Sequence, residues 1–329
     1  MGRPIFLYST ILAVTFVAMA SCATADGPET KGDASPLVFT AGEVSRAFTG
    51  NDNIIDNPFA VWGHFVPTGS VDASPVTVFN GTEVYYTKGN GWHYENTQYW
   101  FPGYSYSFVA LHPASYIASK AVTYNGGALT VTGITPGVDG IDLLAATASR
   151  DCVAGQTMRP VTLNFSHQLS LLAFNGRLAA DADKDVEVIA ARLYGVPSVG
   201  DWSDGQWVSL REITTAASPY REAVSKIFAV DDEASYKGVD IFGDMFVIPQ
   251  FVSADAVFEI KYRYVGIPGD VHVHRVPLSS VSTAIDGRWQ ANRSYRYNFT
   301  IDAGADYILF DTPMVDKWEE GGGGNIIIQ

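Results

Sequence analysis

Cysteine and basic residues are both scarce in this chain. Only two cysteines, Cys22 and Cys152, occur in 329 residues, so a network of disulfides is excluded as the basis of the fold. The 21 Lys and Arg stand against 35 Asp and Glu, a formal net charge of −14. This acidic balance argues against binding to nucleic acid, and against binding to anionic lipid through charge. The fold must therefore be held together by burial of apolar side chains.

The short motifs of common enzymes are also missing. There is no G-x-S-x-G, no H-E-x-x-H and no glycine-rich phosphate loop between a strand and a helix. Adjacent carboxylates such as Asp231 and Asp232 would point to opposite faces of an extended chain. The glycine run 321–324 has the composition of a flexible joint. The sequence therefore predicts neither an enzyme nor a bound cofactor.

Histidine and thiol chemistry is sparse as well. His272 and His274 form "HVH", which would place both rings on one face of a strand, a spacing that some zinc sites use. Because no third ligand stands at a matching spacing, a solvent-facing pair is favoured over a metal site. His167 falls in register with apolar strand neighbours and is expected to be a hydrogen-bonded core residue. Cys152 has no histidine near it in sequence, which favours a bystander thiol over a nucleophile.

The apolar run near the N-terminus is too short for a comfortable membrane span. Residues 5–20 follow Arg3 and are interrupted by polar residues, whereas a spanning helix needs about 20 apolar residues. The pattern is typical of a secretory signal peptide over residues 1–21. The small residues Ala20 and Ser21 before Cys22 resemble a bacterial lipobox, so Cys22 is the expected lipid-attachment residue and the only contact with the membrane. An ordinary signal-peptidase cut and an uncleaved anchor remain alternatives.

Alternation with a period of two runs through most of the chain and predicts an all-β fold. In "YSYSFVA", Tyr104, Tyr106 and Phe108 share one face, and residues 257–265 and 295–301 alternate in the same way. Turn signals between such runs suit antiparallel sandwiches rather than βαβ units. The segment 218–228, which opens with a cap-like serine and a proline, is the one expected short helix.

Composition changes divide the chain into four parts. Residues 22–35 lack aromatic and large aliphatic residues, and we expect a flexible spacer there. The remaining length leaves room for two domains, and the polar stretch 146–160 is the expected seam between them. We therefore predict an N-terminal β-sandwich over residues 36–158 and a C-terminal β-sandwich over residues 159–329.

Aromatic residues make up 13% of the chain and crowd into the segment that follows Gly89. Trp92 and Trp100 are not explained by the strand period, and exposed aromatic rings can stack on sugars. These two residues are therefore candidate glycan contacts. The competing interpretation, that the aromatic residues fill the core of a sandwich, is favoured for the alternating ones.

Several blocks together resemble the fimbrillin family, the type V pilins of gut and oral Gram-negative anaerobes. Residues 91–113, "GWHYENTQYWFPGYSYSFVALHP", are similar to the aromatic block of that family, and "DLLAATASRD" resembles its Asp-Leu-Leu segment. Further similar blocks are "VTLNFSHQLSLLAF", "WQANRSYRYNFTI" and "VDKWEEGG". The resemblance covers nearly all of the chain in order.

The resemblance implies two tandem transthyretin-like β-sandwich domains, export as a lipoprotein, and assembly into fimbriae by strand exchange after proteolysis. The position of Arg46 matches that of the family's cleavage site, so a protease would cut between Arg46 and Ala47. Residues 37–44 would occupy a groove until that cut. The alternative is that Arg46 is an ordinary surface residue and that these residues form a permanent first strand.

The C-terminal "GGGGNIIIQ" joins a flexible run to Ile326, Ile327 and Ile328, which suit a strand laid against a sheet edge. Our hypothesis is that they form a donor strand, either for their own domain or for a neighbouring subunit.

These features favour a structural or tip subunit of an adhesive surface fimbria, located at the cell outer membrane and cell surface, with a lipid-anchored precursor. Its expected partners are other fimbrial subunits, a maturation protease and a host or bacterial surface ligand. A monomeric surface lipoprotein that binds glycans through Trp92 and Trp100 is the second hypothesis. A metal-dependent enzyme using His272 and His274 is a remote third.

Overall fold

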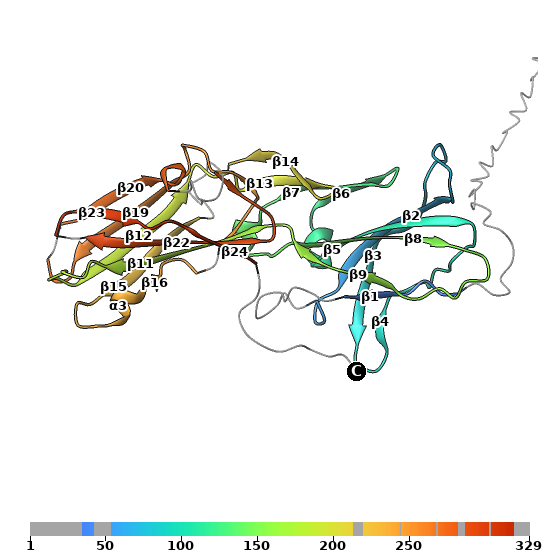
Figure 1. Cartoon of the computed structure of the whole chain (residues 1–329), viewed down its shortest axis with the longest axis horizontal. Coiled ribbons are helices and arrows are strands. Elements are labelled where there is room, and N and C mark those ends of the chain that lie inside the picture. Colours follow the sequence, from blue (N-terminus) through green and yellow to red (C-terminus); the bar gives the residue numbers. More distant parts are fainter. Residues whose placement is uncertain are drawn as a thin grey trace, which may run out of the picture. The chain divides into compact units, whose positions relative to one another are not determined.

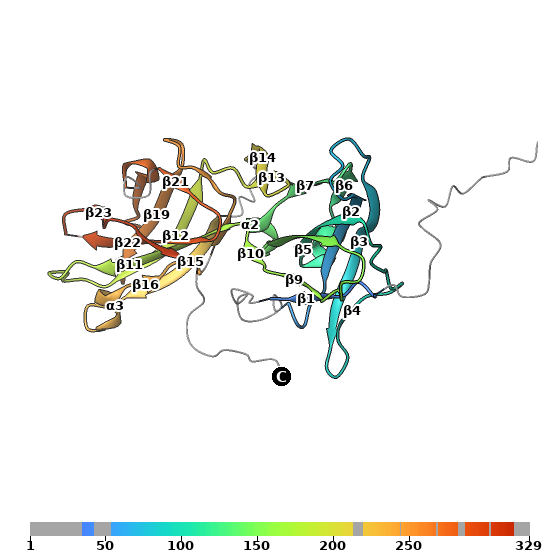
Figure 2. The ribbon, with the colours of Figure 1, turned by 45° about the vertical axis from the view of Figure 1, so that its right-hand side comes forward.

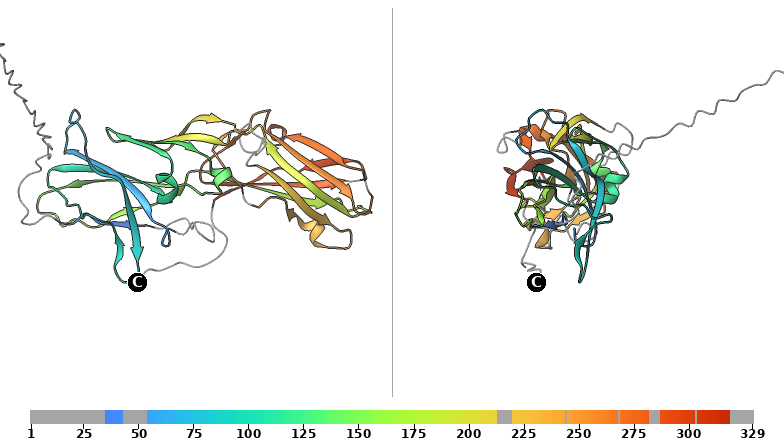
Figure 3. Two further views of the ribbon diagram at one scale, coloured as in Figure 1. Left: turned by 180° about the vertical axis from the view of Figure 1, so that it is seen from behind. Right: turned by 90° about the vertical axis from the view of Figure 1, so that its right-hand side faces the viewer.

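The computed structural model describes residues 35–42, 54–212, 220–243, 245–267, 269–281, 287–302 and 304–318. Strands dominate these ranges, in agreement with the predicted all-β class (Figure 1). The described helices are confined to short turns, as the view from behind in Figure 3 also shows. They are α1 (Ala114–Ala118), α2 (Pro136–Asp139), α3 (Ala234–Lys237) and the 3-10 turn Leu278–Ser280. No helix among the described residues is long and apolar enough to cross a membrane.

The N-terminal part is built on an antiparallel sheet with strand order β10-β8-β5-β2-β3-β4. Beside it, β1 and β9 form a two-stranded parallel sheet. The aromatic face of β5 points into the core here, where Tyr106 and Phe108 are both buried. The bounds are β1 (Phe39–Ala41), β2 (Phe59–Pro67), β3 (Val76–Thr87), β4 (Gly91–His93), β5 (Tyr104–His112), β8 (Leu144–Cys152), β9 (Val161–Leu163) and β10 (Ser166–His167).

Two further sheets enclose a second core (Figure 2). One has the order β16-β11-β22-β23, with β17 also paired to β11 and β24 to β22, and the other has the order β15-β12-β19-β20. Phe174 and Phe258 stack across this core with ring centroids 4.8 Å apart. The bounds are β11 (Ser170–Leu178), β12 (Val186–Tyr194), β15 (Arg221–Phe228), β16 (Val239–Asp240), β17 (Met245–Val247), β19 (Val257–Tyr264), β20 (His272–Pro277), β22 (Arg293–Asp302), β23 (Tyr307–Phe310) and β24 (Met314–Lys317).

A further sheet joins segments from both sides of the predicted seam at residue 158. The sheet β14-β13-β7-β6 pairs Ile134 with Gly200 and Thr130 with Ser203. In addition, β9 and β10 pair with β1 and β8, which precede the seam. The pairing of β9 and β10 therefore joins residues 161–167 to the N-terminal part, while the division into two domains stays a prediction. The remaining bounds are β6 (Ala121–Asn125), β7 (Ala128–Ile134), β13 (Val199–Ser203), β14 (Gln206–Arg211), β18 (Gln250–Phe251) and β21 (Arg288–Trp289).

The predicted helix at 218–228 is wrong, because residues 221–228 form strand β15. This strand pairs antiparallel with β12 and buries Val224 and Phe228. These two residues are four apart, a spacing that puts them on one side of a helix and also on one side of a strand. The periodic signal was therefore ambiguous, and pairing with β12 decides it.

Candidate functional site

Residues 35–42 lie as a short strand in a groove of the N-terminal part. Strand β1 runs parallel to β9, with Phe39 opposite Val161 and Ala41 opposite Leu163 (Figure 1). The Val161 N–H donates to the carbonyl of Val38 at 2.7 Å. The Gly42 N–H donates to the carbonyl of Leu163 at 2.8 Å. One side of the segment is thus bonded to β9.

The other side of the same segment is bonded to residues 94–100. The Leu37 N–H donates to the carbonyl of Gln98 at 2.8 Å, and the Trp100 N–H donates to the carbonyl of Ser35 at 3.0 Å. The Tyr94 hydroxyl donates to the carbonyl of Leu37 at 2.6 Å. Burial raises the pKa of Tyr94, outweighing the opposite effect of its hydrogen bond from the Gln98 N–H, so the phenol keeps the proton that it donates.

The alternate side chains of the segment enter the core. Leu37 is 0% exposed and Phe39 is 1% exposed. The ring centroid of Phe39 lies 5.2 Å from that of Phe79 and 5.3 Å from that of Phe108, both in edge-on contacts. Full burial of a Leu or Phe side chain contributes about 1.5–3 kcal/mol. Leu37 and Phe39 therefore hold this short segment more strongly than its length suggests.

Gly42 is the last residue of the described segment. A Cβ at this position would overlap the side chain of Asn164, the residue after β9. The overlapping atom is Oδ1 at the end of the Asn164 side chain, so a larger residue at position 42 would require that side chain to move aside.

The geometry dictates what would follow if residues 35–42 left the groove. The N–H of Val161 and the carbonyls of Leu163 and Gln98 would lose their partners, and the faces of Phe79 and Phe108 would lose their cover. A strand with unpaired backbone groups beside an apolar trough is a template for pairing with another chain. A replacement strand needs apolar side chains two residues apart, because the strand period is two.

Several predicted site residues lie outside the described residues. These are Cys22, Arg46, Ala47, Ile326, Ile327 and Ile328. Their predicted roles in lipid attachment, cleavage and strand donation stay predictions.

The two predicted glycan contacts differ from each other. Trp100 is 1% exposed, and its ring packs against Tyr106 with centroids 4.7 Å apart. A buried ring offers no face to a sugar, so the expectation for Trp100 is wrong. Trp92 is half-buried between Phe59 and Tyr86, with centroid distances of 5.3 and 5.4 Å. Both tryptophans therefore belong mainly to the packing of this part.

The histidines of the "HVH" pair share a partner. His272 Nδ1 lies 2.8 Å and His274 Nε2 lies 3.1 Å from the same oxygen of Asp306, and both rings stack on Tyr262. The pair shares one strand face, as predicted, but that face is turned to Asp306 and Tyr262 rather than to solvent alone. Within the described residues, no group of three or more metal-ligating side chains has the geometry of a metal site.

His167 occupies the core position that its register predicts. Its Nδ1 lies 2.7 Å from Asp142 Oδ2, and its ring stacks on Trp318 with centroids 3.9 Å apart. Cys152 is buried at the end of β8, where burial raises the pKa of its thiol. A buried thiol with a raised pKa is a poor nucleophile, which fits the prediction of a bystander.

Sequence reasoning missed the residues that bind the first strand on its far side. Tyr94 and Gln98 lie in an irregular segment between β4 and β5, where no period indicates direction. The only available signal was the crowding of aromatic residues between Trp92 and Tyr106.

The chain matches a known protein family, and its fold is similar to solved structures. The family model described as "Fimbrillin-like" matches residues 45–318. A fimbrial protein from Bacteroides vulgatus has a similar structure, with a TM-score of 0.58, 14% identity, and coverage of 87% of this chain and 100% of that one. The tip fimbrial protein Mfa3 from Porphyromonas gingivalis, solved with a C-terminal truncation, gives a TM-score of 0.43, 10% identity, and coverage of 87% and 100%. No curated protein matches the sequence. Since the family match spans well over half of its length, this chain belongs to the fimbrillin-like family.

Proposed function

We propose that this protein is a structural or tip subunit of an adhesive surface fimbria and that it assembles by strand exchange. In the precursor, residues 35–42 fill the groove between β9 and residues 94–100. Cleavage between Arg46 and Ala47 releases this segment. A strand from another subunit then fills the vacated groove.

The observation that carries this proposal is the burial of Leu37 and Phe39 in a segment bonded on both of its edges. Along the chain, this segment is joined to the rest of the described fold through residues 43–53, which contain Arg46. The family match begins at residue 45, so β1 lies outside it. Both facts suit a strand that is present in the precursor and dispensable afterwards.

The C-terminal isoleucines suit the role of the replacement strand. Ile326 and Ile328 are two residues apart, as Leu37 and Phe39 are. Ile327 would take the position of Val38, which is half-buried. A β-branched triplet can therefore supply side chains to both faces of the groove. The glycine run before it gives the reach that donation to a neighbour requires.

The proposal is tested by treating the monomer with an arginine-specific protease and following polymer growth on a gel. We expect a new N-terminus at Ala47, together with heat-sensitive ladders. The Arg46→Ala variant should stay uncut and monomeric. Equal polymer growth from uncut Arg46→Ala protein would contradict gating by this cleavage.

We also propose that Cys22 carries the lipid that holds the precursor at the outer membrane. Stable attachment needs two or more acyl chains, so loss of the thiol should release the protein. Cys22→Ser should abolish palmitate labelling and move the precursor out of the membrane fraction. Retention of the variant in the membrane fraction would refute the lipid anchor.

A monomeric glycan-binding lipoprotein that uses Trp92 and Trp100 is less well supported. Of these two rings, Trp100 is buried and Trp92 is half-buried.

A further inference from the structure

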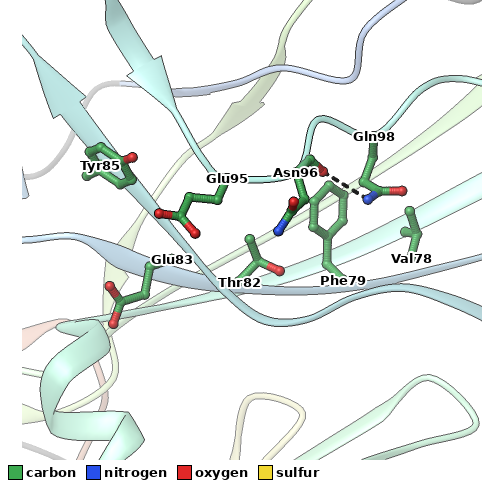
Figure 4. Close-up of a pocket in the computed structure, with 8 residues that line it drawn as sticks. All are labelled: Val78, Phe79, Thr82, Glu83, Tyr85, Glu95, Asn96 and Gln98. Atoms are coloured by element: carbon green, nitrogen blue, oxygen red, sulfur yellow. Dashed lines mark hydrogen bonds between the residues drawn. The ribbon is translucent and has the colours of Figure 1, made fainter.

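A pocket of about 520 Å³ lies beside strand β3, and its lining includes neither of the tryptophans first considered for glycan binding. Figure 4 shows Thr82, Glu83 and Tyr85 on the strand, with Glu95, Asn96 and Gln98 on the segment that passes across from it. The pairing between β2 and β3 is interrupted at residue 81, because Val61 pairs with Thr82 but the next residue, Trp62, pairs with Asn80. Gly81 is the extra residue of this β-bulge and has a φ of 76°.

The polar lining is rich in acceptors and amides. Glu83 and Glu95 contribute two exposed carboxylates, and Asn96 and Gln98 contribute two amides. The Gln98 amide donates to the carbonyl of Asn96 at 3.0 Å, which fixes one wall (Figure 4). Carboxylates accept hydrogen bonds from hydroxyl groups, and amides both donate and accept them. This set of groups matches a ligand that carries several hydroxyls.

The apolar lining includes one partly exposed aromatic ring, that of Tyr85. Phe79 is buried and forms part of the pocket wall. Tyr85 is half-buried, and its ring is held edge-on against His93 with centroids 4.1 Å apart. A fixed aromatic ring beside hydrogen-bonding groups can stack on the C–H face of a sugar ring. The pocket thus combines the two kinds of contact that a sugar offers.

The charge of the pocket lining favours neutral over acidic sugars. The eight described residues that line the pocket include two acids and no base. A sialic or uronic acid would place its carboxylate near Glu83 and Glu95 without a compensating cation, which is unfavourable. The volume lies within the range of small-molecule sites, at a size suited to one or two sugar units.

We infer that this pocket binds a neutral mono- or disaccharide, with Glu83 and Glu95 accepting from its hydroxyls and Tyr85 stacking on its ring. The inference names a ligand class for the adhesive role but needs no strand exchange, because every residue involved is in place in the uncut precursor.

The test is calorimetric titration of the uncut protein with neutral and acidic sugars. The neutral probes are lactose, cellobiose, mannobiose and diacetylchitobiose, and sialyllactose is the acidic counterpart of lactose. We expect at least one neutral probe to bind, and Tyr85→Ala and Glu95→Gln each to weaken it by about tenfold. Asp72→Asn, a change of an exposed carboxylate outside the pocket, should leave the affinity unchanged.

Three results would overturn the inference: binding by none of the neutral probes, preference for sialyllactose over lactose, or an affinity that neither pocket variant lowers. Circular dichroism of each variant separates loss of binding from loss of folding. Because the protein is uncut, a negative result here leaves the assembly proposal standing.

Discussion

His112, at the end of β5, is an unusual buried residue. It is 0% exposed, and neither of its ring nitrogens has a hydrogen-bond partner among the described residues. Burial lowers its pKa from the ordinary 6.5 to about 4. The ring is therefore neutral in the folded protein at neutral pH, and protonation must oppose folding.

The lowered pKa of His112 predicts that the protein loses stability over a defined range of acidic pH. Because the folded pKa lies below the unfolded one, the unfolded chain binds the proton more strongly. Stability should fall as the pH drops below about 6.5 and level off near pH 4, by about 3 kcal/mol at one pKa unit per 1.36 kcal/mol. His112→Leu should lose this part of the pH dependence in urea unfolding between pH 7 and pH 4.

The carboxylates titrate in the same range, so the informative quantity is the difference between variant and wild type. Identical slopes for wild type and His112→Leu would refute the assignment.

Individual residues were predictable where a strand period assigned them a face. The register of His167 predicted a core histidine, and its bond to Asp142 confirms it. Trp100 lies outside any named strand, and no pattern indicated its burial. The alternation of residues 257–265 predicts a polar face for Glu259, yet Glu259 is 1% exposed because Arg192 and Arg275 cover it, each with a nitrogen 2.7 Å from its carboxylate. Periodicity predicts the face to which a side chain points, but it does not predict whether long side chains of neighbouring strands cover that side chain.

At the scale of elements, the long alternating strands were the most predictable. Residues 295, 297, 299 and 301 are all buried, as their alternation requires. The groove was less predictable, because it depends on parallel pairing between Phe39–Ala41 and Val161–Leu163, which are separated by more than a hundred residues. No local pattern specifies such a partner.

Strand β1 should be held mainly by Phe39. Truncation of a buried Phe to Ala costs about 3–5 kcal/mol, and in this segment the loss would leave Leu37 as the other fully buried side chain. In Phe39→Ala we expect faster hydrogen exchange at the amides of Val161 and Trp100, which donate to Val38 and Ser35. Polymer growth after protease treatment should also be faster, because the segment leaves more readily.

Thr40→Ala is the matched control within the same strand, since Thr40 is half-exposed and alternates with the buried pair. It should change exchange at Val161 little. Equal protection of Val161 in Phe39→Ala and Thr40→Ala would argue against Phe39 as the anchor.

At the scale of the whole molecule, the sequence predicts a domain boundary at residue 158, but strand pairs connect segments on both sides of that boundary. The polar stretch 146–160 contains most of β8 and a connection, and the chain then returns to the N-terminal part through β9, which pairs with β1, and β10, which pairs with β8. The β7–β13 pairing joins segments on either side of the predicted seam. A change in composition marks a surface connection, and such a connection need not separate two domains.

The donor role of the C-terminus gives a prediction at this scale. Deletion of residues 325–329 should leave a protein that is cut normally after Arg46 but forms short polymers or none, because no strand is offered to the vacated groove. Gel ladders after protease treatment measure this. The single substitution Ile327→Val keeps the β-branched strand and serves as the control. Ladders of normal length from the truncated protein would assign the donor strand to another part of the chain.

The central claim is that residues 35–42 must leave the groove before another subunit can enter it. A disulfide engineered by the double substitution Thr40→Cys and Thr162→Cys tests this directly, since these two residues are paired across β1 and β9 with their hydroxyl oxygens 3.4 Å apart. Paired positions on neighbouring strands lie within reach of a disulfide. The matched control combines Thr130→Cys with Ser203→Cys, a pair across β7 and β13 with hydroxyls 2.9 Å apart.

Polymer length on a non-reducing gel, after cleavage by an arginine-specific protease, is the deciding measurement. We predict that the oxidised Thr40→Cys, Thr162→Cys variant is cut but stays monomeric, and that reduction restores growth, while the control polymerises in both states. Polymers of equal length from the cut variant with its disulfide intact would contradict the account.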